Sequence, residues 1–433
     1  MSRKSHGSRR TFIAAAGGIA GALGAGAGAG GGIAFAGAKS HAALDMHTAQ
    51  DTVAEPFFGS HQNGIAAPSP MQSHTYFAAL DITATDRKAL IAMLQTWTAA
   101  SARLTAGRLA MAPATPDQPF DSLDALDLGP SRLTLTFGFG PDLFTLAGKD
   151  RFGLAARRPA ALVDLPAFPG EQLEARHTGG AVSVQACADD PQVAFHAVRE
   201  LVRLAGGNAT VRWTQAGFST ANRTQGTARN LMGFKDGTMN PPVGDAAVMN
   251  QHIWVGSEGP RWMQGGSYAV FRRIRIALEH WDQMKLGFQE RTIGRHKLSG
   301  APLGGTHEFD ALDLKAQDKD GNPIIPATAH ARLGAPSENA GAQMLRRAYN
   351  YTDGASFVAE RWPPWKQAME YDAGLMFIAY QHDPRRGFIP MFEKMSRIDA
   401  LNQFTTHVGS AVFACPGGVR HGQYIGQGLF EAV

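Results

Sequence analysis

Cysteine is nearly absent from this 433-residue sequence, which contains only Cys187 and Cys415. There is no C-x-x-C pair, so the usual spacings of zinc and iron–sulfur ligands are excluded. There is also no C-x-x-C-H, so covalent attachment of a c-type haem is excluded. The two cysteines lie in strand-like runs of different halves of the chain. A disulfide is the alternative in an exported protein, but we predict two buried free thiols.

Charge is also sparse and weakly biased. Charged residues make up 18% of the chain, the formal net charge is +4 and the pI is about 9.1. The sequence has no block of Lys and Arg and no basic run interleaved with aromatic residues, so a nucleic-acid partner is not expected. With 44% hydrophobic residues over this length, the composition is globular and sufficient for two domains with cores of their own.

The first residues carry targeting signals and no folding pattern. Ser8–Ile13 reads SRRTFI, a twin-arginine motif, and an Ala/Gly-rich, weakly apolar stretch follows over 14–38. A transmembrane anchor is the alternative, but the many glycines lower the hydrophobicity of the stretch and weaken a helix. We therefore predict that residues 1–38 are a cleaved twin-arginine signal peptide. The mature protein is then periplasmic or secreted, with no stable membrane span.

Periodicity beyond the signal predicts strands that alternate with helices. Residues 39–70, rich in Gly, Pro, Ser and Ala, are expected to form an N-terminal arm. Asp86 is expected to cap a helix with apolar side chains at helical spacing, and Asp190 and Asp383, each followed by proline, to open two more. Strands are predicted at 74–84, 133–138, 181–188, 211–217, 268–276 and 375–381.

The second half of the chain repeats the first at an almost constant offset. Tyr76 and Tyr268 in matching strands are 192 positions apart, and the Asp-Pro-x-x-x-Phe units that end at Phe195 and Phe388 are 193 apart. This offset indicates a duplication that places Phe195 and Phe388 in equivalent core positions. The predicted fold class is α+β: a duplicated ferredoxin-like fold, two antiparallel-sheet halves with helices packed on them, of the dimeric α+β barrel type.

One short segment concentrates the residues that suit chemistry. Gly233–Thr238 reads GFKDGT and places Asp236 between glycines, which take positive φ and let the backbone approach a flat ligand closely. Alone, Asp-Gly is more often a surface turn. Further along come AHARLGAP with His330 and MLRRAYNYTDG with Arg346 and Arg347. A carboxylate, a histidine and an arginine in this order and context resemble the dye-decolourising haem peroxidases, whose signature is the glycine-x-x-aspartate-glycine motif.

The resemblance covers most of residues 70–430 and implies two ferredoxin-like halves with haem in the second. It favours an N-terminal ferredoxin-like domain at 71–235 and a C-terminal ferredoxin-like haem-binding domain at 236–433. The implied cofactor is one haem b per chain, bound non-covalently because c-type attachment is excluded.

The resemblance also implies that His330 is the proximal ligand of the haem iron, and therefore the metal-binding residue. Four other histidines are rivals for this role: His296, His307, His407 and His421. A carboxylate is expected to accept a hydrogen bond from the second ring nitrogen of His330, and both Glu393 and Asp310 are open for it.

On the distal face, the resemblance implies that Asp236 moves a proton between the two oxygens of peroxide. A carboxylate of low pKa stays deprotonated in acid, so activity is expected to favour acidic pH. Arg346, which follows an apolar residue as in the family, is expected to stabilise charge on the leaving oxygen, with Arg347 as its rival.

Further cofactor contacts are expected at seven positions: Gly237, Thr238, Met239, Arg295, Ala335, Pro336 and Ser337. The first three adjoin the distal carboxylate and are expected to touch the haem edge. Arg295 lies in a segment that resembles one whose arginine pairs with a haem propionate. The last three replace the Asn-Pro-Arg that is frequent in the family.

Three functions are open at this point. The first is an exported b-type haem peroxidase that reduces hydrogen peroxide and oxidises dyes or other small-molecule reductants. The second is a deferrochelatase, which takes haem as substrate and releases iron with the porphyrin intact. It is implied because Tyr380–Phe388, YQHDPRRGF, and the export signal resemble the branch found in iron-uptake operons. The third is a haem-binding or iron-delivery protein without turnover. Expected partners include iron-uptake components and further copies of the chain.

Overall fold

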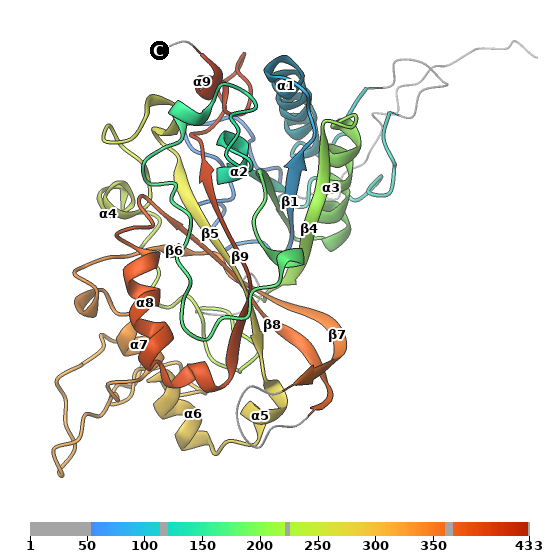
Figure 1. Ribbon diagram of the computed structural model, residues 1–433. Coiled ribbons are helices and arrows are strands. Elements are labelled where there is room, and N and C mark those ends of the chain that lie inside the picture. The colour runs from blue at the N-terminus through green and yellow to red at the C-terminus, as the bar shows by residue number, and fades with distance from the viewer. Residues whose placement is uncertain (1–52, 113–119, 221–225, 360–366, 432–433) are drawn as a thin grey trace, which may run out of the picture. The chain divides into compact units, whose positions relative to one another are not determined.

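The computed structural model, shown in Figure 1, describes residues 53–112, 120–220, 226–359 and 367–431, all within the unit that spans His47–Val433. The signal peptide predicted at 1–38, and the first part of the arm predicted at 39–70, lie outside the described residues. Among the helices of the described ranges, none combines the length and the hydrophobicity that crossing a membrane requires.

The first half of the unit is a four-stranded antiparallel sheet covered by two helices. In chain order it contains β1 (His74–Ile82), α1 (Arg87–Leu104), β2 (Thr134–Phe139), α2 (Pro141–Phe144), β3 (Val182–Ala188), α3 (Pro191–Leu204) and β4 (Ala209–Phe218). The strand order β4-β1-β3-β2 is that of a ferredoxin-like unit. Helices α1 and α3 pack together, and α3 lies across β1 and β3 (Figure 1).

The second half repeats this order with longer insertions. Its elements are α4 (Ala246–His252), β5 (Ser267–Ile276), α5 (Leu278–Asp282), α6 (Leu286–Ile293), α7 (His330–Leu333), β6 (Leu345–Arg346), β7 (Tyr349–Ala359), β8 (Gln367–Gln381), α8 (Phe388–Ile398), β9 (Thr405–Cys415) and α9 (Gln427–Phe430). The order β9-β5-β8-β7 matches β4-β1-β3-β2 strand for strand. The pairs β1–β4 and β5–β9 also share a register shift, after Ala79 and after Arg273. This second match supports the duplication.

The two halves join into one closed sheet. Strand β2 pairs with β9 at Phe139 and Ala414, and β4 pairs with β7 at Phe218 and Asn350. The pairing of β5 with β8 closes the circuit. The predicted fold class, two antiparallel ferredoxin-like halves with helices packed on them, is therefore confirmed.

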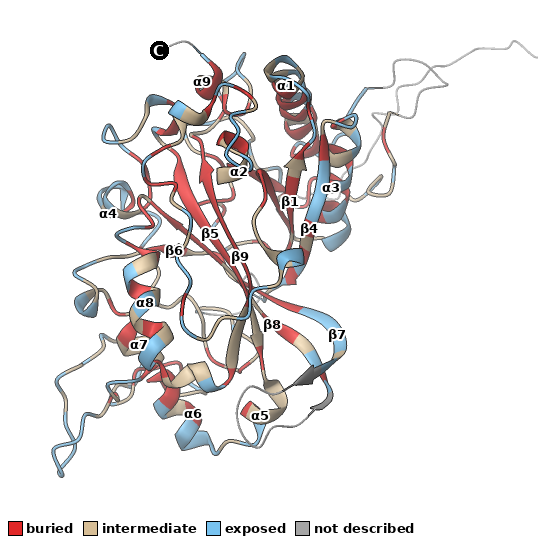
Figure 2. Ribbon diagram, in the orientation of Figure 1, coloured by how far each residue is buried: buried red, intermediate tan, exposed pale blue. Residues whose placement is uncertain are grey.

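Strand residues alternate between two cores, one on each side of the sheet. In β1, Phe77 points to the inner side and stacks on Trp213, whereas Leu80 points to the outer side and packs with α1 and α3. Figure 2 shows the resulting buried colour along the central strands. Cys187 and Cys415 both belong to the inner core and are buried free thiols, which confirms that prediction.

The described part of the N-terminal arm is tied to this inner core. Ile65 is fully buried in it, and Gln62 Nε2 donates to the carbonyl oxygens of Phe137 and Pro416, each at 2.9 Å. Because these carbonyls belong to the two halves of the chain, the arm bridges them.

Two of the three predicted helix caps are confirmed. Asp86 and Asp190 accept hydrogen bonds from backbone N–H groups in the first turns of α1 and α3. The cap predicted at Asp383 is wrong. Its carboxylate pairs with the Arg385 guanidinium at 2.7 Å, and a turn follows before α8 begins. The Gln381 side chain, at 2.6 Å, accepts from the first N–H of α8 instead.

The predicted equivalence of Phe195 and Phe388 is also wrong. Phe388 is 3% exposed, whereas Phe195 is 41% exposed and meets the edge of the Tyr76 ring. Helix α3 begins directly after its Asp, but α8 begins only at Phe388. The same spacing from Asp therefore reaches a different turn of the helix in each half.

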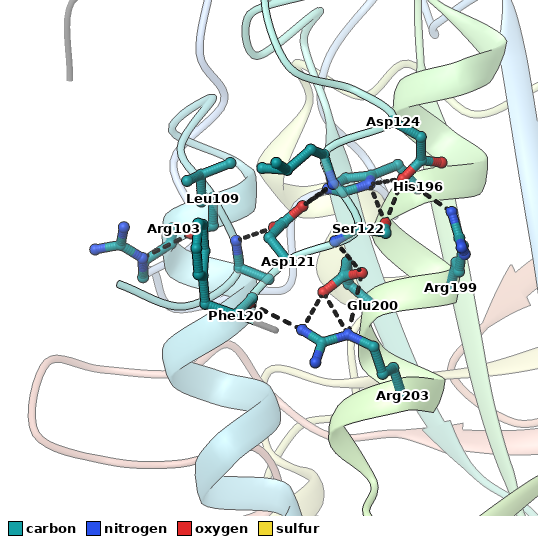
Figure 3. A network of polar contacts seen from close by, with 12 residues as sticks. Arg103, Leu109, Phe120, Asp121, Ser122, Asp124, His196, Arg199, Glu200 and Arg203 are labelled. Atoms are coloured by element: carbon teal, nitrogen blue, oxygen red, sulfur yellow. Dashed lines mark hydrogen bonds and ion pairs between the residues drawn. The ribbon is translucent and has the colours of Figure 1, made fainter. Parts of the chain in front are cut away.

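A buried polar network fastens the loop before β2 to helix α3 (Figure 3). His196 of α3 places Nδ1 2.7 Å from Asp124 and Nε2 3.5 Å from Asp121. Glu200, one turn later, pairs with Arg203 at 2.6 Å. Asp121, His196 and Glu200 lie close enough to suit a cation. However, the carboxylate oxygens of Asp121 and Glu200 already accept hydrogen bonds from backbone N–H groups. The network therefore acts as a structural fastening.

Candidate active site

A deep cavity opens in the second half and encloses about 1540 Å³, its mouth included. Its apolar wall comes from β5, β8 and α8: Ile274, Ile276, Leu375, Phe377, Phe388, Met391, Phe392 and Met395. The GFKDGT loop and the first turn of α7 also line it, together with segments that include Arg346 and Asp399. A large apolar cavity with a few polar groups suits a flat organic cofactor.

His330, the first residue of α7, is held in this cavity by a carboxylate. Its Nδ1 lies 2.7 Å from Asp399 Oδ2, and the other Asp399 oxygen accepts from Leu401 N at 2.8 Å. The His330 side chain keeps 38% of its surface exposed, and this surface faces the cavity. The arrangement leaves Nε2 for a ligand and orients the ring, as metal-binding histidines require.

The carboxylate partner corrects the sequence prediction. Neither Glu393 nor Asp310 contacts His330. Glu393 pairs with Arg397 on α8 at 3.2 Å, and Asp310 accepts backbone N–H bonds within its own loop. Asp399 lies 69 positions from His330, and no local pattern in the sequence connects the two.

The charges around His330 act on its pKa in opposite directions. Burial and the Arg346 charge lower the pKa, but Asp399 and Asp236 together raise it more, so the net pKa is above the ordinary value. The three predicted residues are therefore close enough to interact across one cavity.

The four rival histidines differ from His330 in their surroundings. His296, His307 and His421 do not line the cavity. His407 does, but its Nδ1 accepts from Arg272 Nε at 3.0 Å, and burial together with Arg272 holds its pKa well below the ordinary value. A ring that faces a cation is a weaker metal ligand than one that faces a carboxylate. The cavity therefore favours His330.

The GFKDGT loop carries Asp236 into the cavity wall. Gly233 and Gly237 have φ of +84° and +99°, where glycine is favoured, and Asp236 N donates to Ala228 O at 2.9 Å. Within the described residues, the Asp236 carboxylate accepts no hydrogen bond and forms no ion pair. It is therefore free to exchange a proton with a ligand.

Arg346 lines the cavity and is held by hydrogen bonds to Asn240. Asn240 Oδ1 accepts from the backbone N and Nε of Arg346, at 3.1 and 3.2 Å, and Asn240 Nδ2 donates to its carbonyl oxygen at 2.8 Å. Arg347 points to the inner core, where it donates to Pro68 O and Gln72. Arg346, and not Arg347, therefore lines the cavity that contains His330 and Asp236.

Most of the other predicted contact residues also reach the cavity. Gly237, Thr238, Met239, Arg295 and Pro336 line it. Arg295 is buried and its Nη1 donates to the carbonyl oxygens of Gly300 and Glu308, at 2.8 and 2.9 Å.

The structure does not bring Ala335 and Ser337 to the wall. Ala335 is buried and is the N-cap of the short 3-10 helix Pro336–Glu338, whereas Ser337 is exposed to solvent. In a 3-10 helix consecutive side chains point about 120° apart, so Ser337 points away from the cavity that Pro336 lines.

The residues present fit a haem. The cavity is apolar, one imidazole nitrogen faces it, and Arg295 and Arg346 supply positive charge for propionates or developing oxyanions. Sequence reasoning missed Asp399 and Asn240, whose positions in the site depend on contacts between distant segments.

Comparison with known proteins agrees with this reading. Family models described as Dyp-type peroxidase, N-terminal, and Dyp-type peroxidase, C-terminal, match residues 62–219 and 227–420. A dye-decolorizing peroxidase of Thermobifida fusca is 38% identical over 386 residues, 86% of this chain and 84% of the relative. A deferrochelatase of Yersinia pestis is 35% identical over 442 residues, 98% of this chain and 95% of the relative.

A solved structure shows the same fold. The crystal structure of a DyP-type peroxidase from Streptomyces coelicolor superposes with a TM-score of 0.79 at 42% sequence identity, and the match covers 88% of this chain and 98% of that chain. The similarity therefore spans both ferredoxin-like halves and the cavity between the GFKDGT loop and α7.

Proposed function

Because the chain belongs to the Dyp-type peroxidase family, whose members bind haem, we propose that it holds one haem b per chain, non-covalently, in the cavity lined by His330, Asp236 and Arg346. The protein is a haem peroxidase of the dye-decolourising type. When bound, haem supplies the redox-active iron at which hydrogen peroxide is reduced. The single observation that carries the assignment is the imidazole of His330, tied to Asp399 and open to an apolar cavity.

His330 would hold the haem iron through Nε2. The Asp399 carboxylate accepts a hydrogen bond from Nδ1–H, which selects the tautomer that leaves Nε2 unprotonated. The negative charge of Asp399 also makes the ring a stronger donor to a metal.

Asp236 and Arg346 act on peroxide. The free Asp236 carboxylate takes a proton from one peroxide oxygen and delivers it to the other, so that the second leaves as water. The Arg346 guanidinium stabilises the negative charge that develops on the leaving oxygen. Asn240 holds this arginine by three hydrogen bonds, so its charge is already in position before the reaction starts.

Stopped-flow mixing with peroxide, followed by the haem absorbance, tests these roles. Asp236→Asn is expected to slow the reaction by roughly 10²–10⁴-fold with normal haem content, since the side chain keeps its shape and loses its base. Arg346→Leu is expected to lose about 3–4 kcal/mol of charge stabilisation. Glu393→Gln, on the exposed face of α8, is the control and should react at the parent rate. Parent rates in both distal variants would overturn the assignment.

Release of iron from haem is a second candidate, favoured by the similarity to a deferrochelatase over 98% of this chain. In that reaction haem is the substrate, and the same cavity binds it. Iron-free porphyrin as a product, measured by its fluorescence after incubation with haem and a reductant, supports this activity. Haem recovered intact, with no peroxide turnover, instead supports a carrier.

We also propose export by the twin-arginine route, to the periplasm or beyond, on the evidence of residues 1–38. Arg9→Lys combined with Arg10→Lys is expected to leave the protein in the cytoplasm, because a receptor reads the arginine pair. Cell fractionation that finds the variant exported would exclude this route. Association with further copies of the chain is part of the same proposal, and light scattering of the purified protein measures it.

A further inference from the structure

Glu308 occupies an unusual place for a loop carboxylate. It lies in the long segment between α6 and α7, yet its side chain is only 9% exposed. Its Oε1 accepts from Thr227 N at 3.0 Å and from the Thr227 hydroxyl, and also lies 3.3 Å from Thr238 Oγ1. Its Oε2 lies 2.5 Å from Lys235 Nζ. One carboxylate thus contacts three residues of the segment that carries Asp236.

The backbone of the same residue holds a second part of the site. The carbonyl oxygen of Glu308 accepts from Arg295 Nη1 at 2.9 Å, and the neighbouring Gly300 carbonyl accepts from the same nitrogen at 2.8 Å. Arg295 is the residue expected to meet a propionate. Glu308 therefore connects the distal carboxylate loop with the predicted propionate anchor.

The surrounding backbone is built closely around this ion pair. A Cβ on Gly226 would lie 2.3 Å from Glu308 Oε2, and a Cβ on Gly300 would lie 2.7 Å from Lys235 Cδ. Gly226 and Gly300 have φ of +79° and +77°, where side chains are strained. The positive φ therefore favours glycine at both positions, and a side chain at either one would displace the Lys235–Glu308 pair.

We infer that Glu308 is a positioning residue that holds the Asp236 loop and Arg295 in one arrangement before the cofactor and peroxide bind. The inference rests on the proposed function. Its physical basis is that a buried carboxylate with several donors is costly to move, since each lost partner leaves a buried charge less compensated. Misplacement of a reacting group by about 1 Å costs on the order of 10²-fold in rate.

The titration of Glu308 agrees with this geometry. Burial raises its pKa, but the hydrogen bonds from Lys235 and Thr227 lower it more, so the net pKa is below the ordinary value. The lowered pKa favours the ionised form, which is the form that accepts from Lys235 and Thr227.

Glu308→Gln in the haem-loaded protein tests the inference. Glutamine keeps the shape of the side chain and one carbonyl acceptor, but removes the charge that balances Lys235. We expect the rate constant for the reaction with peroxide to fall about tenfold or more, and its pH profile to shift. We also expect haem transfer to an acceptor protein to become about tenfold faster, because a displaced loop moves the Glu308 carbonyl oxygen that accepts from Arg295. The second readout does not depend on turnover.

Asp310→Asn is the matched control. Asp310 lies two positions away in the same loop, but its carboxylate accepts from Thr306 and His307 and contacts neither Asp236 nor Arg295. It is expected to react and to retain haem within about twofold of the parent, since its change stays within the loop. Circular dichroism confirms that each variant is folded. If Glu308→Gln loses its fold, Glu308→Asp, which keeps the charge but shortens the reach, replaces it.

The outcomes separate the inference from the proposed function. Suppose that Glu308→Gln has the reaction rate, pH profile and haem retention of the parent protein, while Asp236→Asn reacts more slowly. This result would overturn the positioning role of Glu308 and leave the proposed function standing. If Asp236→Asn is also unaffected, the proposed function fails first. An equal loss of thermal stability in Glu308→Gln and Asp310→Asn, with both reacting at the parent rate, identifies a purely structural role and overturns the inference.

Discussion

The contact between His330 and Asp399 gives the sharpest test of how the site is built. Asp399→Asn removes the negative charge and leaves the shape of the side chain. The amide oxygen of the introduced asparagine is still able to accept from His330 Nδ1, or from Leu401 N if the amide is turned. The substitution therefore separates the charge of the partner from its geometry, whereas Asp399→Ala removes both.

The expected magnitude follows from the burial of the pair. The Asp399 side chain is 3% exposed and its contact with His330 is 2.7 Å, so solvent screens the interaction little. Loss of a hydrogen-bonded partner behind a metal-binding histidine typically costs roughly 10–100-fold in metal affinity, or about 1.4–2.8 kcal/mol. We expect Asp399→Asn near the lower end of this range and Asp399→Ala near the upper end. The ferric state should also become easier to reduce, since a less basic imidazole stabilises it less.

Haem titration of the apoprotein, followed by the Soret absorbance, measures the affinity, and a redox titration measures the potential. Glu393→Gln is the control, because Glu393 lies on α8, which ends just before Asp399, but is exposed and pairs with Arg397. An unchanged affinity and an unchanged potential in Asp399→Ala would refute the reasoning, and would remove His330 as the iron ligand.

Three further outcomes are expected. Asn240→Leu removes the hydrogen bonds that hold Arg346 and should slow the reaction with peroxide by about tenfold or more at normal haem content, as stopped-flow mixing measures. A reaction at the parent rate would show that Arg346 does not need Asn240 to hold its position. His196 has a raised pKa, because its contacts with Asp121 and Asp124 outweigh burial, and the pKa of Asp124 is lowered to about 2 despite burial. The contribution of His196 to the free energy of unfolding is therefore complete below about pH 6.5 and is lost as pH rises through its folded pKa. The contribution of Asp124 to the free energy of unfolding is lost as pH falls from about 3.8 toward about 2. Urea unfolding should thus show His196→Asn to be less stable at pH 5, by about 1–3 kcal/mol, with a smaller difference at pH 9; equal differences would contradict this. Removal of haem should lower the thermal midpoint, and added haem should restore it in proportion to RT ln(1 + [L]/Kd), which calorimetry checks.

Features that depend on neighbours in the sequence were predicted correctly. The caps at Asp86 and Asp190 need only a carboxylate followed by a helix, and both are present. The offset between Tyr76 and Tyr268 predicted a duplicated unit because similar sequence patterns repeat at a nearly fixed distance along the chain. The strand order of the two halves agrees with this prediction.

Features that depend on where an element begins were predicted less well. The second Asp-Pro unit does not open its helix, because Asp383 pairs with Arg385 and the Gln381 side chain satisfies the helix start instead. A side chain from the preceding strand took over the role that the local pattern gave to Asp383. Which of the Gln381 and Asp383 side chains caps the helix cannot be read from the local sequence. As a result Phe388 is the first residue of its helix, whereas Phe195 lies in the second turn of α3.

Short motifs around Asp236 and His330 were enough to predict the family resemblance and the chemical types of these site residues. The choice between Arg346 and Arg347 depends on strand pairing. Strand β6 pairs with β8 at Leu345 and Arg346, and Leu345 lies in the inner core. Because side chains alternate along a strand, Arg346 faces the cavity and Arg347 the inner core. Likewise Asn240 and Asp399 reach the residues they hold only because strand pairing and helix packing bring together segments that are far apart along the chain.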